Sequence, residues 1–406
     1  MSLPPYKSMN SRFEVNRRDF LLATSVIGAG LALGSPVAWA QDKAESSEPQ
    51  KPATNVADVL NVPRTRFSIP GAFPGRTVEV HSLKSMKDGQ PVAAAVNDMF
   101  VAGIEKLTGK SGKEAYGLFF EPEDVIGIKI NPVGGLMNTR MEVVDAIIAW
   151  LEASGHTRKN IIIWDRFDYM LPDTGYTPER FPGIGLEGLQ TMDESAAMGE
   201  TDDDSRWLDE KGNHRSVGNF DMNTFYWADV DGPKDKPYLN QHVFNGKESY
   251  FGKLVTQKLT KIINVPVFKN TGNGVSMATK NLGYGAICNT GRLHRPLFFD
   301  VCTEVMAFPC LRDKVVLNIN DGLRGQYDGG PMPAAAFTYD HHKLYFATDP
   351  FALDMACHKE MVQIRKDKDV DVNEHPIFTE YLHYAERLGL GVVDETKTEH
   401  IVEELG

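Results

Sequence analysis

The sequence predicts an α/β fold in which helices flank a mostly parallel sheet. Residues 125–130 form a short apolar run, residues 141–153 have the apolar spacing of a helix, and residues 160–164 form a second apolar run. A strand, a helix and a strand in this order are typical of a right-handed crossover between parallel strands. Further short apolar runs follow at residues 261–268, 314–319 and 344–347, so the same sheet is expected to continue.

The remaining regular elements are placed in chain order by spacing and by capping residues. A first strand is expected at residues 77–80, and helical spacing follows over residues 91–108. Asp349 and Pro350 predict a helix start, with Asp as the N-cap and Pro at the first helical position, and this helix should run to about residue 365. An amphipathic helix is expected near residues 377–388.

A long insertion, residues 168–250, separates the two α/β parts of the sequence. It is rich in Gly, Asp, Pro and aromatic residues and lacks regular spacing. Irregular insertions of this length often form lids, so we predict that it caps the strand ends. In that arrangement Phe225, Tyr226 or Trp227 should lie near Lys129 and Lys269.

The N-terminal residues 1–40 have the pattern of a twin-arginine export signal. Arg17 and Arg18 precede an uncharged stretch, and Ala38-Trp39-Ala40 resembles a cleavage site. The expected partner is the twin-arginine translocase, the expected location is the periplasm, and no membrane span should remain after cleavage. An uncleaved anchor is the alternative. Residues 41–75 are predicted as a flexible linker and residues 76–406 as the α/β domain.

Composition narrows the classes of partner and cofactor. The formal charge of −12 disfavours nucleic acid as a partner. The four cysteines contain no CxxC pair, so neither an iron–sulfur cluster nor a zinc ribbon is supported, and buried free thiols are expected. These cysteines are Cys288, Cys302, Cys310 and Cys357. The cofactor is not identified by the sequence, although a metal ion is compatible with it.

Polar and cationic residues follow the predicted strands, where ligands collect in open parallel sheets. If these cations converge in an acidic protein, they form a pocket that attracts a small carboxylate or phosphate. A lysine crowded by other cations loses affinity for its proton and can act as a base or nucleophile. Side chains that merely point into solvent are the alternative.

The candidate residues are assigned to three roles. The candidate catalytic residues are Lys269, Lys280 and His294. The candidate ligand-binding residues are Lys129, Asn131, Asn281, Arg292 and Gly330. The candidate metal ligands are Asp321, Asp349 and Asp354.

Several of these residues belong to motifs that resemble the family named domain of unknown function 362, over most of residues 120–360. The matching segments are Ile128-Lys129-Ile130-Asn131-Pro132, residues 262–269, Thr279-Lys280-Asn281-Leu282-Gly283, His294, residues 329–331 and residues 347–354. The resemblance implies the family's fold. Many relatives are exported and some carry an added ferredoxin-like domain, which this cysteine pattern does not match. The family name implies no established reaction.

Two functions fit these features. The first is an exported enzyme that acts on a small anionic metabolite, with Lys269, Lys280 and His294 as binding or acid–base groups. The second is a non-catalytic periplasmic protein that binds an anion or metal in the same cleft.

Overall fold

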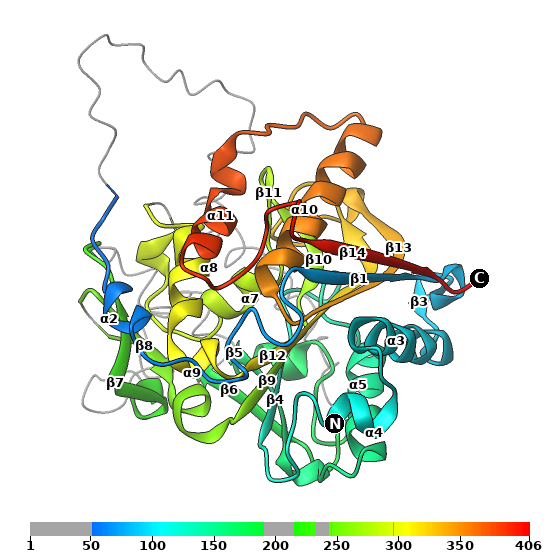
Figure 1. The fold of residues 1–406 in the computed structure, drawn as a ribbon, viewed down its shortest axis with the longest axis horizontal. Coiled ribbons are helices and arrows are strands. Elements are labelled where there is room, and N and C mark those ends of the chain that lie inside the picture. The colour runs from blue at the N-terminus through cyan, green and yellow to red at the C-terminus, as the bar shows by residue number, and fades with distance from the viewer. Residues whose placement is uncertain (1–50, 191–214, 232–242, 245, 295) are drawn as a thin grey trace, which may run out of the picture.

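The structure, a computed structural model, describes residues 51–190, 215–231, 243–244, 246–294 and 296–406. It confirms the predicted α/β class, because a mixed sheet of mostly parallel strands lies between helices (Figure 1). Residues 1–40, where the export signal is predicted, lie outside the described residues. No helix in the described part of the chain is both long and apolar enough to cross a bilayer.

The main sheet has the strand order β14-β1-β13-β12-β9-β4-β5-β6, and β10 pairs with β12 and β11. From β12 through β9, β4 and β5 to β6 all neighbours are parallel, whereas β13 is antiparallel to both β12 and β1. The strands are β1 (Arg76–His81), β4 (Ile126–Lys129), β5 (Ile161–Phe167), β6 (Gly185–Gln190), β9 (Lys261–Asn264), β10 (Val267–Thr271), β11 (Gly274–Val275), β12 (Val315–Gln326), β13 (Thr338–Ala347) and β14 (Glu399–Glu404). Two separate hairpins are β2 (Met86–Lys87) with β3 (Gln90–Pro91), and β7 (Phe220–Trp227) with β8 (Glu248–Gly252).

The crossover unit is present as predicted, with β4 and β5 parallel and α5 (Met141–Ala153) between them. Side chains along β5 alternate between the two faces of the sheet. Ile161 and Ile163 belong to the apolar core on one face, and Ile162 and Trp164 belong to the core on the other. A strand with two apolar faces must be covered on both sides, so β5 needs packing partners on each face of the sheet.

Helices cover both faces of the sheet and bury these two cores. Helices α3, α4 and α5 contribute to one core, and α7, α8, α9 and α11 contribute to the other, as their positions on opposite sides of the strands in Figure 1 show. The helices are α2 (Ala57–Leu60), α3 (Ala93–Thr108), α4 (Gly112–Tyr116), α5, α6 (Met170–Asp173), α7 (Ala278–Gly283), α8 (Asp300–Glu304), α9 (Pro309–Arg312), α10 (Pro350–Asp367) and α11 (Glu380–Arg387).

The described parts of the insertion extend the sheet and form a hairpin on one of its faces. β6 pairs in parallel with β5. In the hairpin, the Tyr226 hydroxyl donates to Glu304 at 2.7 Å, and Phe225 lines a groove with Lys261 and Lys314. These two lysines lie at the amino ends of β9 and β12, opposite to Lys129. The cap prediction therefore does not hold for Phe225, because this residue lines a groove at the amino ends of β9 and β12.

Residues 51–75 pack against the domain, although the sequence predicts them as part of a flexible linker. Asn55 exchanges hydrogen bonds with the Phe225 carbonyl and the Trp227 amide at 3.1 and 2.8 Å. The Arg64 guanidinium donates to the Gly389 carbonyl at 2.7 Å, and the Ile69 side chain is fully buried. These partners are distant in sequence, so local composition gave no sign of them.

Candidate functional site

Lys129, the last residue of β4, is buried and its amine is fully engaged. It donates to the Ile130 carbonyl at 2.8 Å, to Asp165 Oδ1 at 2.5 Å and to Asn281 Oδ1 at 3.1 Å. An ammonium group has three donors, so these three acceptors satisfy it. Burial lowers the pKa of Lys129 and the Asp165 carboxylate opposes that effect. Lys129 therefore acts as a fixed buried charge.

Four buried asparagines connect Lys129 to the centre of the sheet. Asn131 Nδ2 donates to Asn281 Oδ1 at 3.2 Å, and Asn281 Nδ2 donates to Asn264 Oδ1 at 2.8 Å. Asn264 Nδ2 then donates to Asn318 Oδ1 at 2.9 Å. Each amide accepts at its oxygen and donates from its nitrogen, with Lys269 and the carbonyls of Ala347 and Thr348 as the partners at the two ends, so the network holds these side chains in single orientations.

Lys269, in β10, is as deeply buried as Lys129 but has far fewer partners. Its amine donates to Asn131 Oδ1 at 3.0 Å, and it forms no other hydrogen bond or ion pair with the described residues. Burial lowers its pKa to about 7, and the charge of Lys280 adds to this effect. The Lys269 amine is therefore close to half neutral near pH 7 and retains unused donor positions.

Lys280, in α7, and His294, after the short 3-10 helix Gly291–Leu293, are half-buried and lie against the same two aromatic rings. The Lys280 amine lies 4.6 Å from the Phe298 ring centre and 5.9 Å from that of Tyr284. The His294 ring centre is 4.6 Å from Tyr284 and 5.8 Å from Phe298. This shared contact places the two polar groups on one aromatic surface.

Lys280 and His294 both have pKa values below those of exposed lysine and histidine side chains. Burial lowers the pKa of Lys280 to about 8, and Lys280 forms no hydrogen bond or ion pair with the residues that the structure describes. Burial, aided by the charge of Lys280, lowers the pKa of His294 to about 3, so its ring is neutral near pH 7. His294 Nδ1 lies 2.9 Å from the Thr290 carbonyl and must donate to it. Its Nε2 therefore carries the lone pair.

Two neighbouring residues, Asp165 and Arg166 of β5, were not among the candidates. Asp165 forms the ion pair with Lys129, and Arg166 Nη1 donates to Thr290 Oγ1. The charge of Arg166 also lowers the pKa of His294. Both follow Trp164 at the end of a predicted strand, and the rule that polar residues collect at strand ends would have included them.

Arg292 and Gly330, two predicted ligand-binding residues, have structural roles. Arg292 donates to the carbonyls of Ala228, Val230 and Lys247 at 2.7–3.1 Å, so it fixes the ends of the β7–β8 hairpin. Gly330 N donates to Asn270 Oδ1 at 3.0 Å, and a Cβ at Gly330 would lie 2.1 Å from the Asn270 carbonyl oxygen. Close backbone approach explains this glycine.

The three predicted metal ligands hold backbone amides instead. Asp349 accepts from Phe351 and Ala352 as the N-cap of α10, and also from Gly75 and Val392. Asp354 accepts from the amides of Ala278 and Thr279 at the start of α7. Asp321 accepts from the Arg140 and Leu323 amides. No group of three or more His, Cys, Asp or Glu side chains suited to a metal occurs in the described ranges.

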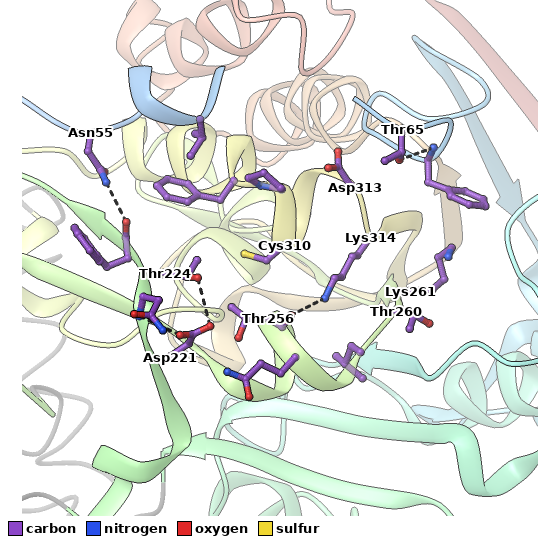
Figure 2. A pocket seen from close by; sticks show the side chains of 18 of the residues that line it. Asn55, Thr65, Asp221, Thr224, Thr256, Thr260, Lys261, Cys310, Asp313 and Lys314 are labelled. Carbon is purple, nitrogen blue, oxygen red and sulfur yellow. Dashed lines mark hydrogen bonds between the residues drawn. The ribbon is translucent and has the colours of Figure 1, made fainter. Parts of the chain in front are cut away.

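A groove of about 1040 Å³ lies at the opposite ends of the strands (Figure 2). Its cations are already paired: Lys261 lies 3.1 Å from Asp124, and Lys314 donates to the carbonyls of Val255 and Thr256. Figure 2 shows Lys314 turned towards Thr256. This groove lacks the unpaired lysines of the other end, so we place the candidate site at the strand carboxyl ends. We refer to Lys129, Lys269, Lys280 and His294, with Asp165, as the lysine site.

The fold and the lysine site thus define an α/β protein with a cluster of buried and half-buried cationic side chains at the carboxyl ends of its parallel strands. The chain belongs to the family described as Domain of unknown function (DUF362), whose model matches residues 126–359. That range contains every residue of the lysine site. A search of curated proteins finds no match.

Proposed function

We propose that the protein is exported and acts on a small anionic metabolite at the lysine site. The observation that supports this proposal is the imbalance of charge. Among the described residues, Asp165 is the only carboxylate within ion-pair distance of Lys129, Lys269 or Lys280. Buried charges are normally paired, so two lysines without a counterion favour an anionic ligand.

The expected ligand carries a carboxylate or phosphate group and is small. Lys269 has donor positions left after its bond to Asn131, and Lys280 has no polar partner among the described residues. A bound anion would offer acceptors to both amines and raise their pKa values. His294, whose ring lies against the same two aromatic rings as Lys280, adds a lone pair on Nε2 that can accept a proton during a reaction.

Calorimetry with acetate, malonate and inorganic phosphate tests this proposal. Lys269→Met should weaken binding by at least about tenfold, because one charge-assisted hydrogen bond is lost. The matched control is Lys84→Met, since Lys84 is an exposed lysine outside the site. Equal affinity of the wild type and Lys269→Met for every anion would exclude the lysine site.

A non-catalytic binding protein is the competing function, and export is a separate part of the proposal. A ligand that co-purifies and remains unchanged after incubation would favour binding over catalysis. Replacing Arg17 and Arg18 by Lys should leave unprocessed precursor in the cytoplasm, whereas mature protein in the periplasm of that variant would contradict the export route. Metal analysis of protein purified from the periplasm tests for an inserted metal.

A further inference from the structure

We propose that Lys280 forms an imine with the carbonyl carbon of a small oxo acid, and that His294 moves the protons of this step. The inference rests on the proposed function, since it takes the metabolite to be an anion, and it names the class: a carboxylate that also carries a ketone or aldehyde. The inference depends on differences in burial and in hydrogen-bond partners among the three lysines of the site.

The three lysines differ in their availability to a ligand. Lys129 is buried and has three acceptors, including a carboxylate, so its lone pair is not available. Lys269 is buried behind Asn131 and is suited to supply charge. Lys280 is half-buried, lies over two aromatic rings and has no hydrogen-bond or carboxylate partner in the described part of the chain. Its amine is therefore the one that a substrate can reach.

The environment of Lys280 favours its neutral, nucleophilic form. An aromatic surface removes water from the amine, and desolvation disfavours the charged state. The lowered pKa of Lys280, about 8, agrees with this geometry. The nearby charge of Lys269 would attract the substrate carboxylate, which places the adjacent carbonyl carbon towards the free amine.

His294 is suited to carry protons between the amine and the carbonyl oxygen. Its Nδ1 is fixed on the Thr290 carbonyl, so Nε2 is the working atom, and its ring lies on the same two aromatic side chains as Lys280. The neutral ring offers the Nε2 lone pair to a proton of the attacking amine. Its pKa of about 3 makes it a weak base, so it passes this proton on to oxygen rather than keeping it. His294 is a proton carrier here and does not bind the carboxylate.

The step balances without any further reactant. The Lys280 lone pair forms the N–C bond while the carbonyl π electrons move to oxygen. Two protons reach that oxygen: the one that the Lys280 ammonium loses to become the neutral amine, and one that His294 Nε2 moves from the nitrogen after the N–C bond has formed. The oxygen then leaves as water when the C–O bond breaks. An ammonium group and a carbonyl thus give a protonated imine and one water, with no oxidant or reductant.

Reductive trapping tests the inference directly. The full mature protein is incubated with pyruvate and cyanoborohydride, and the adduct is located by peptide mass mapping. We expect a single reduced adduct on Lys280, none with propionate, and none in Lys280→Arg, which keeps the charge. Lys84→Arg should label as the wild type does. His294→Gln should slow trapping by about a hundredfold, the usual range for a proton carrier, while pyruvate affinity changes little.

The outcomes separate this inference from the proposed function. Pyruvate binding without an adduct on Lys280 overturns the imine and leaves anion binding intact. An adduct on Lys269, or uniform labelling of exposed lysines, also overturns it. No binding of any anion contradicts both. Circular dichroism of Lys280→Arg confirms that a lost adduct does not reflect a lost fold.

Discussion

The two ends of the parallel strands both carry buried or half-buried lysines, but the lysines at the two ends differ in their hydrogen-bond and ion-pair partners. At the amino ends, Lys261 pairs with Asp124, and Lys314 donates to two backbone carbonyls. At the carboxyl ends, Lys129 has a full set of partners, whereas Lys269 has one neutral acceptor and Lys280 has ring faces alone among the described residues. Burial is therefore common to both ends, and the unused donor positions of Lys269 and Lys280 distinguish the candidate site among the described residues.

This contrast separates lysines that stabilise the fold from lysines suited to a ligand. Removing one member of a buried ion pair strongly destabilises the protein, because the other charge stays buried without compensation. A buried amine without a carboxylate destabilises the native state until an anion arrives. The following substitutions test that division, from the largest expected effect to the smallest.

Removing Lys129 should have the largest effect. Lys129→Met leaves the buried Asp165 carboxylate without its ion-pair partner, which should lower the free energy of unfolding by about 3–5 kcal/mol. Lys269→Met removes an amine whose acceptor is the neutral Asn131, so its cost should be at most about 1–2 kcal/mol. Urea unfolding of both variants measures the difference. Equal losses of unfolding free energy in the two variants would contradict the distinction between lysines that stabilise the fold and lysines suited to a ligand.

A double variant sharpens this result. Adding Asp165→Asn to Lys129→Met removes the unpaired charge, so part of the lost stability should return. If the double variant is less stable than Lys129→Met, then Asp165 stabilises the fold through partners other than Lys129.

Gly285→Ala should disturb the same region by steric means. A Cβ at Gly285 would lie 2.2 Å from the Asn281 carbonyl oxygen and 2.7 Å from Lys129 Cε. Overpacking of this kind should cost about 1–3 kcal/mol in thermal or urea unfolding. Gly135→Ala is the matched control, because a Cβ there meets nothing within 4 Å. A neutral Gly285→Ala would show that the backbone around Asn281 and Gly285 adjusts without loss of stability.

The pH dependence of the free energy of unfolding should reveal the lowered pKa of Lys269. The pKa of Lys269 is about 7 in the folded protein, against an ordinary value of 10.5, so the unfolded chain binds more protons between these pH values. Stability should therefore rise with pH above 7, with a contribution approaching about 1.4 kcal/mol per pH unit. Below pH 7 both states are protonated and the contribution is constant.

Lys269→Met removes this titrating group and provides the comparison. The wild type should gain stability relative to the variant as the pH increases from 7 to 9, measured by urea unfolding at each pH. Parallel curves for the two proteins would mean that Lys269 titrates normally.

Lys314→Met at the groove should have the smallest effect. Its amine donates to the carbonyls of Val255 and Thr256 beside an open groove, where water can replace it. The expected loss is about 0.5–1 kcal/mol. Anion binding should be unchanged, and a change in calorimetry would place the ligand in the groove instead.

Much of the fold follows from the sequence because its signals are local. The apolar spacing of α5 and the Asp349-Pro350 cap predict elements that the structure contains. β14 and the hairpin of the insertion were not predicted, because their pairing partners are distant in the chain. Predicted strand 261–268 is divided into β9 and β10 at Val265-Pro266.

The site was harder to predict than the sheet. The strand-end rule selected Lys129 and Lys269, yet it could not tell which was satisfied. The partners of Lys129 are 36 and 152 positions away, at Asp165 and Asn281. Arg292 was assigned to a ligand because its carbonyl acceptors in the hairpin carry no sequence signal.

The last strand, β14, has a consequence for how the chain is made. β14 pairs in parallel with β1, near the start of the described domain, and Arg76 and Glu399 join their side chains at 2.7 Å. Residues 399–404 leave the ribosome long after residues 76–81, so the edge of β1 stays open through most of synthesis. An open strand edge invites pairing with other chains. A polypeptide that stops short of Glu399 would have the mostly buried β1 as its edge strand, in place of the glutamate-rich and largely exposed β14, so we expect it to aggregate more readily.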